Sequence, residues 1–226
     1  MAKTCAIHQP NFLPWLGYFY KIAKSDVFVI LDTVDIEIGT SKAITNRTKI
    51  KAQTGDIWIT IPIKKGESKL IKDIEIVNSN WKEKMLKTIF HEYRKAINFN
   101  EMYPIIEQII QFDNYLLSEF NSNAIKSISS YLNFNTQIHL ASSLPVYTED
   151  RNLRIIEICE YLGCNTYFSG KGGAKYHDEQ LFNNHEITIN YTDYIQPTFN
   201  QLHGEFISGL SIIDYLFVRN SADKIW

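Results

Sequence analysis

TCAIHQPNFLPWLGYFYKIAKSDVFVILD, residues 4–32, is the stretch of sequence that decides the fold. Thr4–Ile7 is β-prone and stops before Pro10, which has no N–H group and cannot continue a central strand. Pro14 favours the start of a helix, in which apolar side chains recur at helical spacing, and a second apolar run follows at Val27–Leu31. The stretch therefore predicts a strand, a polar turn, a short helix and a second strand.

The polar turn of this unit carries His8, Gln9 and Asn11. In parallel α/β folds, ligands bind beyond the carboxyl ends of strands, beside the N-terminus of the following helix. These side chains either cap and satisfy a tight loop or form part of a site. Three side chains with donor and acceptor capacity in one loop favour the site.

The segments HQPNFLPWLGYFYKI (8–22), SGKGGAKY (169–176) and LSIIDYLF (210–217) resemble the WbqC-like protein family, and the resemblance runs over nearly the whole chain. It implies a place in bacterial gene clusters for O-antigen and other surface polysaccharides. It further implies a reaction that attaches an amino acid such as glycine to an amino sugar. No mechanism comes with the resemblance, so the residues must supply one.

Composition excludes several classes of protein. The chain has 226 residues, 45% of them hydrophobic, which is enough for one ample core or for a domain with an insert. A net charge of −2, from 23 basic and 25 acidic residues, provides no global field for nucleic acid. Cys5, Cys159 and Cys164 have no metal-ligand spacing, so we expect buried free thiols and no metal site.

Hydropathy gives no sign of a membrane protein. No apolar run approaches the roughly 18–20 residues that span a bilayer, and no apolar leader precedes the first strand. We therefore expect a soluble, cytoplasmic protein without a membrane span. The sequence does not specify an oligomeric state.

The alternation of strand and helix patterns predicts one α/β domain over residues 1–226. Its core is expected to be three-layered with a mostly parallel sheet, interrupted by a mainly helical insert at 78–135. The insert is expected to contain helices at Trp81–Tyr93, Tyr103–Phe120 and Asn121–Leu132. Before it, Ile57–Ile63 and Ile71–Val77 alternate as a β-hairpin, and Asn46-Arg47 follows a loop at Thr33–Thr45.

The layout is similar to the HUP class of nucleotide-binding folds, which includes nucleotidyltransferases. Those families carry an H-x-G-H motif at the start of the helix, where this chain has Trp15-Leu16-Gly17-Tyr18. Only the glycine is shared. Stabilisation of a departing pyrophosphate by those histidines therefore cannot be transferred to this chain.

A second polar turn, Ser169–Gly173, follows the predicted strand Thr166–Phe168. A glycine-rich turn lets the backbone approach a phosphate closely, and Lys171 adds positive charge. The turn matches no P-loop or dinucleotide fingerprint, so it is a weak signal by itself. Because the carboxyl ends of parallel strands emerge at one edge, we expect both polar turns to meet at one ligand.

These observations lead to a hypothesis of amide formation on a nucleotide-linked amino sugar, by an acyl or aminoacyl transferase or an ATP-dependent ligase. His8 would act as general base or as a polar anchor, and Gln9 would orient the acyl group. Asp214, an acid within an apolar helix pattern, would orient a cation or a histidine. Because no Ser/Cys/His triad spacing is visible, we expect direct attack without a covalent intermediate.

The residues expected to contact substrate are Asn11, Trp15, Tyr18, Asn46, Arg47, Ser169, Gly170, Lys171, Gly172, Gly173 and Tyr176. For Arg47, a solvated basic turn is the alternative to binding of a phosphate or carboxylate. The cofactor is undefined, with ATP or an activated acyl donor as the candidates. The alternative function is a non-catalytic sugar-nucleotide-binding or scaffold protein of polysaccharide assembly.

Overall fold

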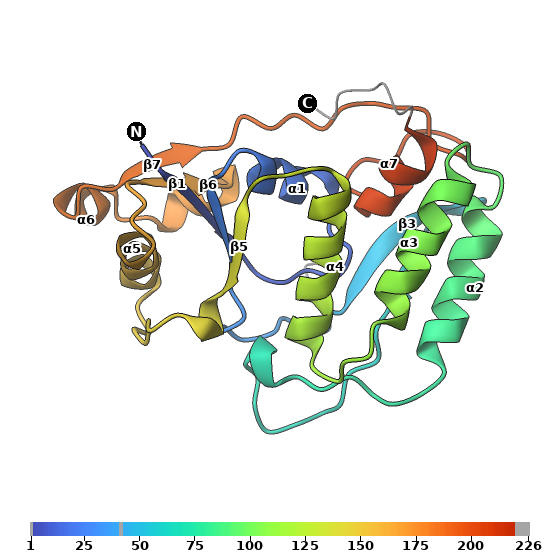
Figure 1. The fold of residues 1–226 in the computed structure, drawn as a ribbon, viewed down its shortest axis with the longest axis horizontal. Coiled ribbons are helices and arrows are strands. Elements are labelled where there is room, and N and C mark those ends of the chain that lie inside the picture. The colour runs from blue at the N-terminus through green and yellow to red at the C-terminus, as the bar shows by residue number, and fades with distance from the viewer. Residues whose placement is uncertain (1, 41–42, 220–226) are drawn as a thin grey trace. The chain divides into compact units, whose positions relative to one another are not determined.

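The structure is a computed structural model that describes residues 2–40 and 43–219 (Figure 1). The chain divides into two compact units, which are described separately below. Unit 1 consists of Met1–Gln9, Gly17–Val34 and Ser129–Ile195. Unit 2 consists of Pro10–Leu16, Asp35–Ile128 and Gln196–Trp226.

Unit 1 contains a five-stranded sheet in the order β5-β2-β1-β6-β7. The strands are β1 (Thr4–His8), β2 (Val27–Ile30), β5 (Gln137–Leu140), β6 (Thr166–Ser169) and β7 (Thr188–Tyr191). Every neighbouring pair in this sheet is parallel. The sheet confirms the predicted α/β fold class.

Helices cover both faces of the sheet. They are α1 (Leu16–Ala23), α5 (Arg151–Tyr161) and α6 (Glu179–Asn184), with short 3-10 helices η2 (Ala141–Ser143) and η3 (Lys171–Tyr176). On one face, Cys5 and Val29 pack in a core with Phe182 of α6. On the other face, Phe28 contacts Tyr18 of α1, with ring centroids 5.3 Å apart. Side-chain alternation along the strands therefore produces the three layers.

Two local signals in unit 1 are confirmed. Asp150 caps α5 by accepting hydrogen bonds from the backbone N–H groups of Asn152 and Leu153, and Gly163 ends the helix with φ of +65°. The predicted buried free thiols are confirmed as well, because the three cysteines are buried and form no disulfide.

Unit 2 combines a β-hairpin with helices. The hairpin pairs β3 (Arg47–Ala52) with β4 (Gly55–Thr60). The helices are η1 (Ile71–Asp73), α2 (Trp81–Tyr93), α3 (Phe99–Gln111), α4 (Leu117–Tyr131, whose last residues belong to unit 1) and α7 (Ile212–Val218). Helices α2, α3 and α4 lie within the predicted insert, whose role as an insert in one domain stays a prediction.

Two predictions for unit 2 were wrong: the second strand of the hairpin, predicted at Ile71–Val77, and the extent of the helix predicted at Tyr103–Phe120. The hairpin partner of β4 is Arg47–Ala52, and Ile71–Asp73 is a 3-10 helix, although Ile76 forms an isolated bridge with Ile63. The predicted helix Tyr103–Phe120 is interrupted after Gln111. There the Asn114 side chain accepts from the backbone N–H of Leu116, and this local bond competes with helix formation.

In the described part of the chain, no helix has both the length and the apolar character needed to cross a membrane.

Candidate functional site

The carboxyl ends of β1 and β6 lie side by side at the edge of the unit 1 sheet where its parallel strands end (Figure 1). The two strands are parallel neighbours, with Ala6 opposite Phe168. His8 and the turn that begins at Ser169 therefore leave the sheet at the same edge. The predicted meeting of the two polar turns at one edge is confirmed, and their sharing of a ligand stays a prediction.

His8 is a neutral imidazole at the end of β1. Its ring centroid lies 4.8 Å from that of Tyr18, on the α1 face. Burial, assisted by the nearby Lys21 cation, lowers the pKa of His8 to about 3. Its Nδ1 lies 3.3 Å from the backbone oxygen of Gln9, which can only accept a hydrogen bond. We therefore assign the proton to Nδ1 and the lone pair to Nε2.

The backbone carbonyl of Gln9 is held by a buried side chain of the following helix. Tyr18 Oη donates to this oxygen at 3.0 Å, and burial raises the pKa of Tyr18, which keeps the phenol protonated. The same oxygen faces His8 Nδ1. Two donors therefore fix the first peptide of the turn, so Tyr18 acts on the site by positioning His8 and Gln9.

Lys21 is a buried cation that the sequence analysis missed. Its side chain is buried near the carboxyl end of β1, where Nζ donates to the carbonyl of Ile7 at 3.1 Å. Burial lowers the pKa of Lys21 to about 8. A buried lysine with a lowered pKa beside a polar turn is typical of functional sites. Its position three residues after Tyr18, on the same helical face, was the available signal.

The turn Ser169–Gly173 is built around a close approach at Gly173. A Cβ atom on residue 173 would lie 2.7 Å from Ser169 Oγ and 2.8 Å from His177 Cε1. Only glycine fits there without a shift of its neighbours. His177 Nε2 lies 3.2 Å from the same point, so the turn brings a buried serine and a histidine together, although no triad spacing was visible in the sequence.

His177 is oriented by a short chain of hydrogen bonds. Its Nδ1 lies 3.3 Å from Tyr191 Oη, and this hydroxyl donates to Glu179 Oε1 at 3.1 Å. The tyrosine oxygen therefore accepts from Nδ1–H, which leaves the lone pair on Nε2. Burial lowers the pKa of His177, and Glu179 opposes that shift. No sequence pattern identified this residue, because the turn geometry alone brings it to Ser169.

The rest of the second turn faces solvent. Lys171, Gly172 and Tyr176 are exposed, and Gly170 is half-buried. A Cβ on Gly172 would meet nothing within 4 Å. Lys175 Nζ lies 4.9 Å from the Tyr176 ring centroid. Lys171 is thus accessible to an anion from solvent, whereas Ser169 is buried.

Asn11, in unit 2, is a buried amide whose side-chain atoms have no hydrogen-bond partner among the described residues. It is 1% exposed, and both Nδ2 and Oδ1 are unpaired. Beside it, Asn121 Nδ2 donates to the carbonyls of Pro10 and Thr45, both at 2.7 Å. Leaving a buried polar atom unpaired costs about 1–3 kcal/mol, so Asn11 calls for a ligand or an ordered water.

The loop that carries Asn11 is strained and tightly held. Leu13 has φ of +38°, a conformation that a branched side chain rarely adopts. Its carbonyl accepts from Thr48 Oγ1 at 3.3 Å and from Ser211 Oγ at 2.7 Å. Half-buried Trp15 forms a β-bridge with Ser211. Strain of this kind persists only where the surroundings impose it, and such places are frequent in functional sites.

Asn46 and Arg47 organise the start of β3. Asn46 Nδ2 donates to the carbonyl of Ile61 at 3.0 Å, which is a structural role. Arg47 donates from Nε to the Ala43 carbonyl at 2.9 Å and from Nη2 to the Thr40 carbonyl at 2.5 Å. Arg47 is therefore an ordered cation and not a freely solvated basic turn.

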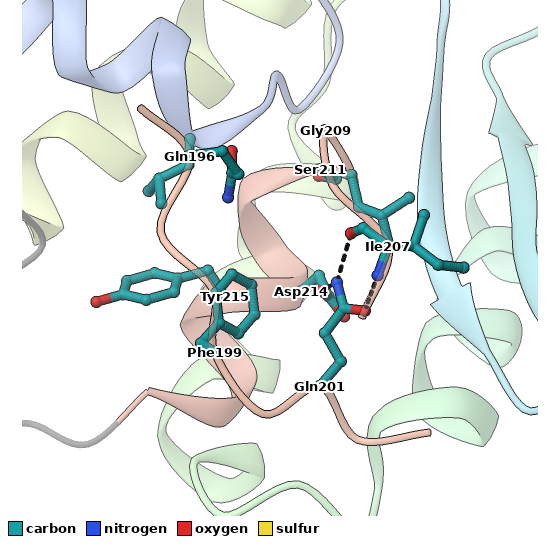
Figure 2. A pocket seen from close by; sticks show the side chains of 10 residues that line it. Gln196, Phe199, Gln201, Ile207, Gly209, Ser211, Asp214 and Tyr215 are labelled. Atoms are coloured by element: carbon teal, nitrogen blue, oxygen red, sulfur yellow. Dashed lines mark hydrogen bonds between the residues drawn. The ribbon is translucent and has the colours of Figure 1, made fainter. Parts of the chain in front are cut away.

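Asp214 belongs to a buried network in unit 2 (Figure 2). Its carboxylate accepts from Tyr93 Oη at 3.2 Å and from Gln201 Nε2 at 2.8 Å. Burial raises the pKa of Asp214 to about 6, although these bonds and the charges of Lys51 and His203 oppose the shift. Gln201 also bonds both backbone polar groups of Ile207. Sequence analysis identified the buried acid but not these partners.

The Asp214 network borders a small cavity. Its lining includes Gln196, Phe199 and Ser211, as Figure 2 shows. The volume of about 10 Å³ is close to the minimum for one water molecule. This cavity is too small for a sugar, so the network stabilises α7 and its neighbouring loop.

Within residues 2–40 and 43–219, no group of three or more metal-ligating side chains gathers in one place.

Comparison with known proteins identifies the family. Residues 9–225 match the WbqC-like protein family. The chain belongs to this family. A protein of similar length from Mycobacterium tuberculosis, "Uncharacterized protein Rv1507c", is 31% identical over 220 residues, which cover 95% of this chain and 93% of the relative. No solved structure matches the sequence significantly.

The predicted site residues of this WbqC-like chain fall into two sets. Unit 1 holds His8, Gln9, Tyr18, Ser169, Gly170, Lys171, Gly172, Gly173 and Tyr176. Unit 2 holds Asn11, Trp15, Asn46, Arg47 and Asp214. In unit 1 the structure brings the β1 and β6 turns to one sheet edge. In unit 2 Trp15 is linked through Ser211 to the strained loop.

Proposed function

We propose that the protein forms an amide bond by transferring an acyl or aminoacyl group to a nucleotide-linked amino sugar of surface polysaccharide biosynthesis. The observation that carries the proposal is the shared edge of β1 and β6. It combines the neutral His8 with a glycine-rich turn that presents Lys171. Amide formation needs an uncharged amine, an oriented acyl carbon and stabilisation of negative charge.

The properties of His8 favour a role as a hydrogen-bond acceptor that anchors the amine over a role as general base. A pKa of about 3 leaves Nε2 unprotonated throughout the physiological range, so it can accept a hydrogen bond from the attacking amine. The same low pKa makes the imidazole a weak proton acceptor. His8 would thus orient the amine lone pair toward the acyl carbon.

The buried amide of Asn11 also supports a polar ligand. Its unpaired donor and acceptor match the N–H and C=O of an acylamino or aminoacyl group. Pairing with such a ligand would remove the cost of burying them unpaired. A bound water would satisfy the same atoms, and ligand-dependent protection of the Asn11 side-chain amide protons distinguishes the two cases.

The direct test is product analysis by mass spectrometry. Purified protein is incubated with UDP-linked amino sugars, glycine and ATP, or with a preactivated glycyl donor. Amide product together with AMP identifies a ligase, and amide product from the preactivated donor alone identifies a transferase. Binding of the sugar nucleotide without product under either condition identifies the alternative, a non-catalytic binding or scaffold protein.

A further inference from the structure

The β3–β4 hairpin has one buried face and one cationic face. Ile50 and Ile59 are buried in the core of unit 2. Because side chains alternate along a strand, Arg47, Lys49 and Trp58 lie on the opposite face. Lys49 stands directly across from Trp58 in the antiparallel register. Two cations therefore flank one indole on the surface of the hairpin.

Trp58 is an exposed aromatic ring held between charges. The residue is 39% exposed. The Arg47 guanidinium carbon lies 4.2 Å from the ring centroid and Lys49 Nζ lies 5.3 Å from it. Stacking on Arg47 fixes the plane of the indole. The result is an ordered, partly exposed indole with two cations over its ring.

This face borders a groove large enough for a small molecule. The groove is lined by Ile44, Arg47, Lys49, Trp58 and Gly209 and has a volume of about 430 Å³. Ligand pockets typically measure about 300–1,000 Å³. Gly209 has φ of +75°, and a Cβ atom there would meet nothing within 4 Å, so its side of the groove is open.

The charges in the groove are partly available to a ligand. Both hydrogen bonds that order Arg47 end on backbone carbonyls, so these contacts leave its charge uncompensated. Lys49 pairs with Asp56 at 2.6 Å, and both side chains are partly exposed. An exposed pair of this kind is weak and exchanges readily for a phosphate.

We propose that Trp58, Arg47 and Lys49 form a binding site for a nucleoside diphosphate. The base stacks on Trp58, and the pyrophosphate pairs with Arg47 and Lys49. A flat aromatic group joined to a compact anion matches an indole flanked by two cations. The choice of a nucleoside diphosphate rests on the proposed function, because a nucleotide-linked sugar carries this group.

The test is a titration of intrinsic tryptophan fluorescence with UDP and GDP. We expect saturable quenching in the wild type that is lost in Trp58→Phe, because Trp58 is the tryptophan of the proposed site. Affinity measured by calorimetry should fall about 5- to 150-fold in Trp58→Leu, the range for loss of one stacked base. Lys49→Gln should weaken binding and reduce its salt dependence. Lys65→Gln, on an exposed loop of the same unit, is the matched control.

Two results would overturn the proposal. One is an absence of binding by either nucleotide in a wild type with a cooperative thermal transition. The other is equal affinity for inorganic pyrophosphate and UDP, unchanged in Trp58→Leu, which would define an anion site without stacking. Because no step requires turnover, nucleotide binding without amide product would refute the proposed function and leave this site standing.

Discussion

Ser211 Oγ donates to the carbonyl of Leu13 at 2.7 Å across 198 positions of sequence. The same oxygen caps α7 by accepting from the backbone N–H of Ile213. One hydroxyl therefore holds the strained loop after Asn11 and begins the last described helix. It links two of the three motifs that resemble the family.

Ser211→Ala should lower the free energy of unfolding by about 1–3 kcal/mol, because it removes a cap and leaves a buried carbonyl with a weaker partner. Urea denaturation of wild type and variant measures the difference. The control is Ser143→Ala, which removes an exposed bond to the Leu140 carbonyl and should cost less than about 0.5 kcal/mol. Equal effects of both substitutions would contradict the stabilising role assigned to the cap and the buried hydrogen bond of Ser211.

Gly173→Ala should destabilise unit 1, because its methyl group would overlap Ser169 Oγ and the His177 ring. Overpacking of this kind costs about 1–3 kcal/mol. Thermal unfolding of Gly173→Ala and Gly172→Ala provides the comparison, since a Cβ on Gly172 meets nothing. A Gly173→Ala protein as stable as Gly172→Ala would mean that the turn shifts freely.

Asp214 should make stability fall as pH rises from about 4 to 6. Its folded pKa of about 6 lies above the unfolded value near 3.8, so the folded state binds more protons in this window. Protonation of Asp214 contributes fully to the free energy of unfolding below the unfolded pKa, and this contribution is lost as the pH rises through 6. The free energy of unfolding should change by on the order of 3 kcal/mol across this window. Tyr93, Lys51 and His203 face the same carboxylate.

Asp214→Asn removes the titration of this carboxylate. Because Tyr93 donates to Oδ1 and Gln201 to Oδ2, the amide keeps an acceptor oxygen for one of these two donors. Unfolding free energies measured from pH 4.5 to 8 should show a flatter slope in the variant. Parallel curves for wild type and variant would contradict a raised pKa of Asp214.

His8→Ala should abolish or greatly reduce amide formation while the protein stays folded, since a half-buried turn residue leaves no core cavity. Loss of a general base costs about 10²- to 10⁴-fold in rate. His8→Gln separates the roles, because glutamine accepts a hydrogen bond but cannot act as a base that takes up the proton of the amine. Recovery of rate in His8→Gln supports the anchor, and wild-type turnover by His8→Ala would reduce His8 to a structural cap.

Lys171→Ala should weaken binding of a phosphorylated ligand at the sheet edge. Because Lys171 is exposed, solvent screens its charge and the loss should stay near the lower end of the about 1.5–3 kcal/mol of a charged hydrogen bond. The dissociation constants of wild type and variant should differ less at 300 mM salt than at 50 mM salt. An identical salt dependence in both proteins would remove Lys171 from the site.

The sequence was sufficient to predict unit 1 because its signals are local. Apolar strands, the Asp150 cap and the Gly163 stop depend on neighbouring residues, and parallel pairing then determines where His8 and Ser169 emerge. Strand β3 was missed because RTKIKA was interpreted through its cations, either as an anion-binding segment or as a solvated basic turn. Its charged face is the hairpin surface described above.

The least predictable site residues owe their properties to tertiary contacts. Lys21 becomes a buried cation only when its helix packs under the Ile7 carbonyl. Ser169 and His177 both lie close to Gly173 only because residue 173 has no Cβ atom. For Lys21 the helical spacing from Tyr18 was the one signal in the sequence, and for His177 the sequence contains no periodic signal.

The central position of β1 has a consequence for how the chain acquires its structure. During synthesis β1 can pair at once with β2, but its other neighbour, β6, emerges about 160 residues later, as the bond from Lys3 N to Asn165 Oδ1 across 162 positions indicates. Until then one side of the first strand lacks its partner. Such long-range pairing is slow, so the nascent chain exposes an aggregation-prone edge until its last third has left the ribosome.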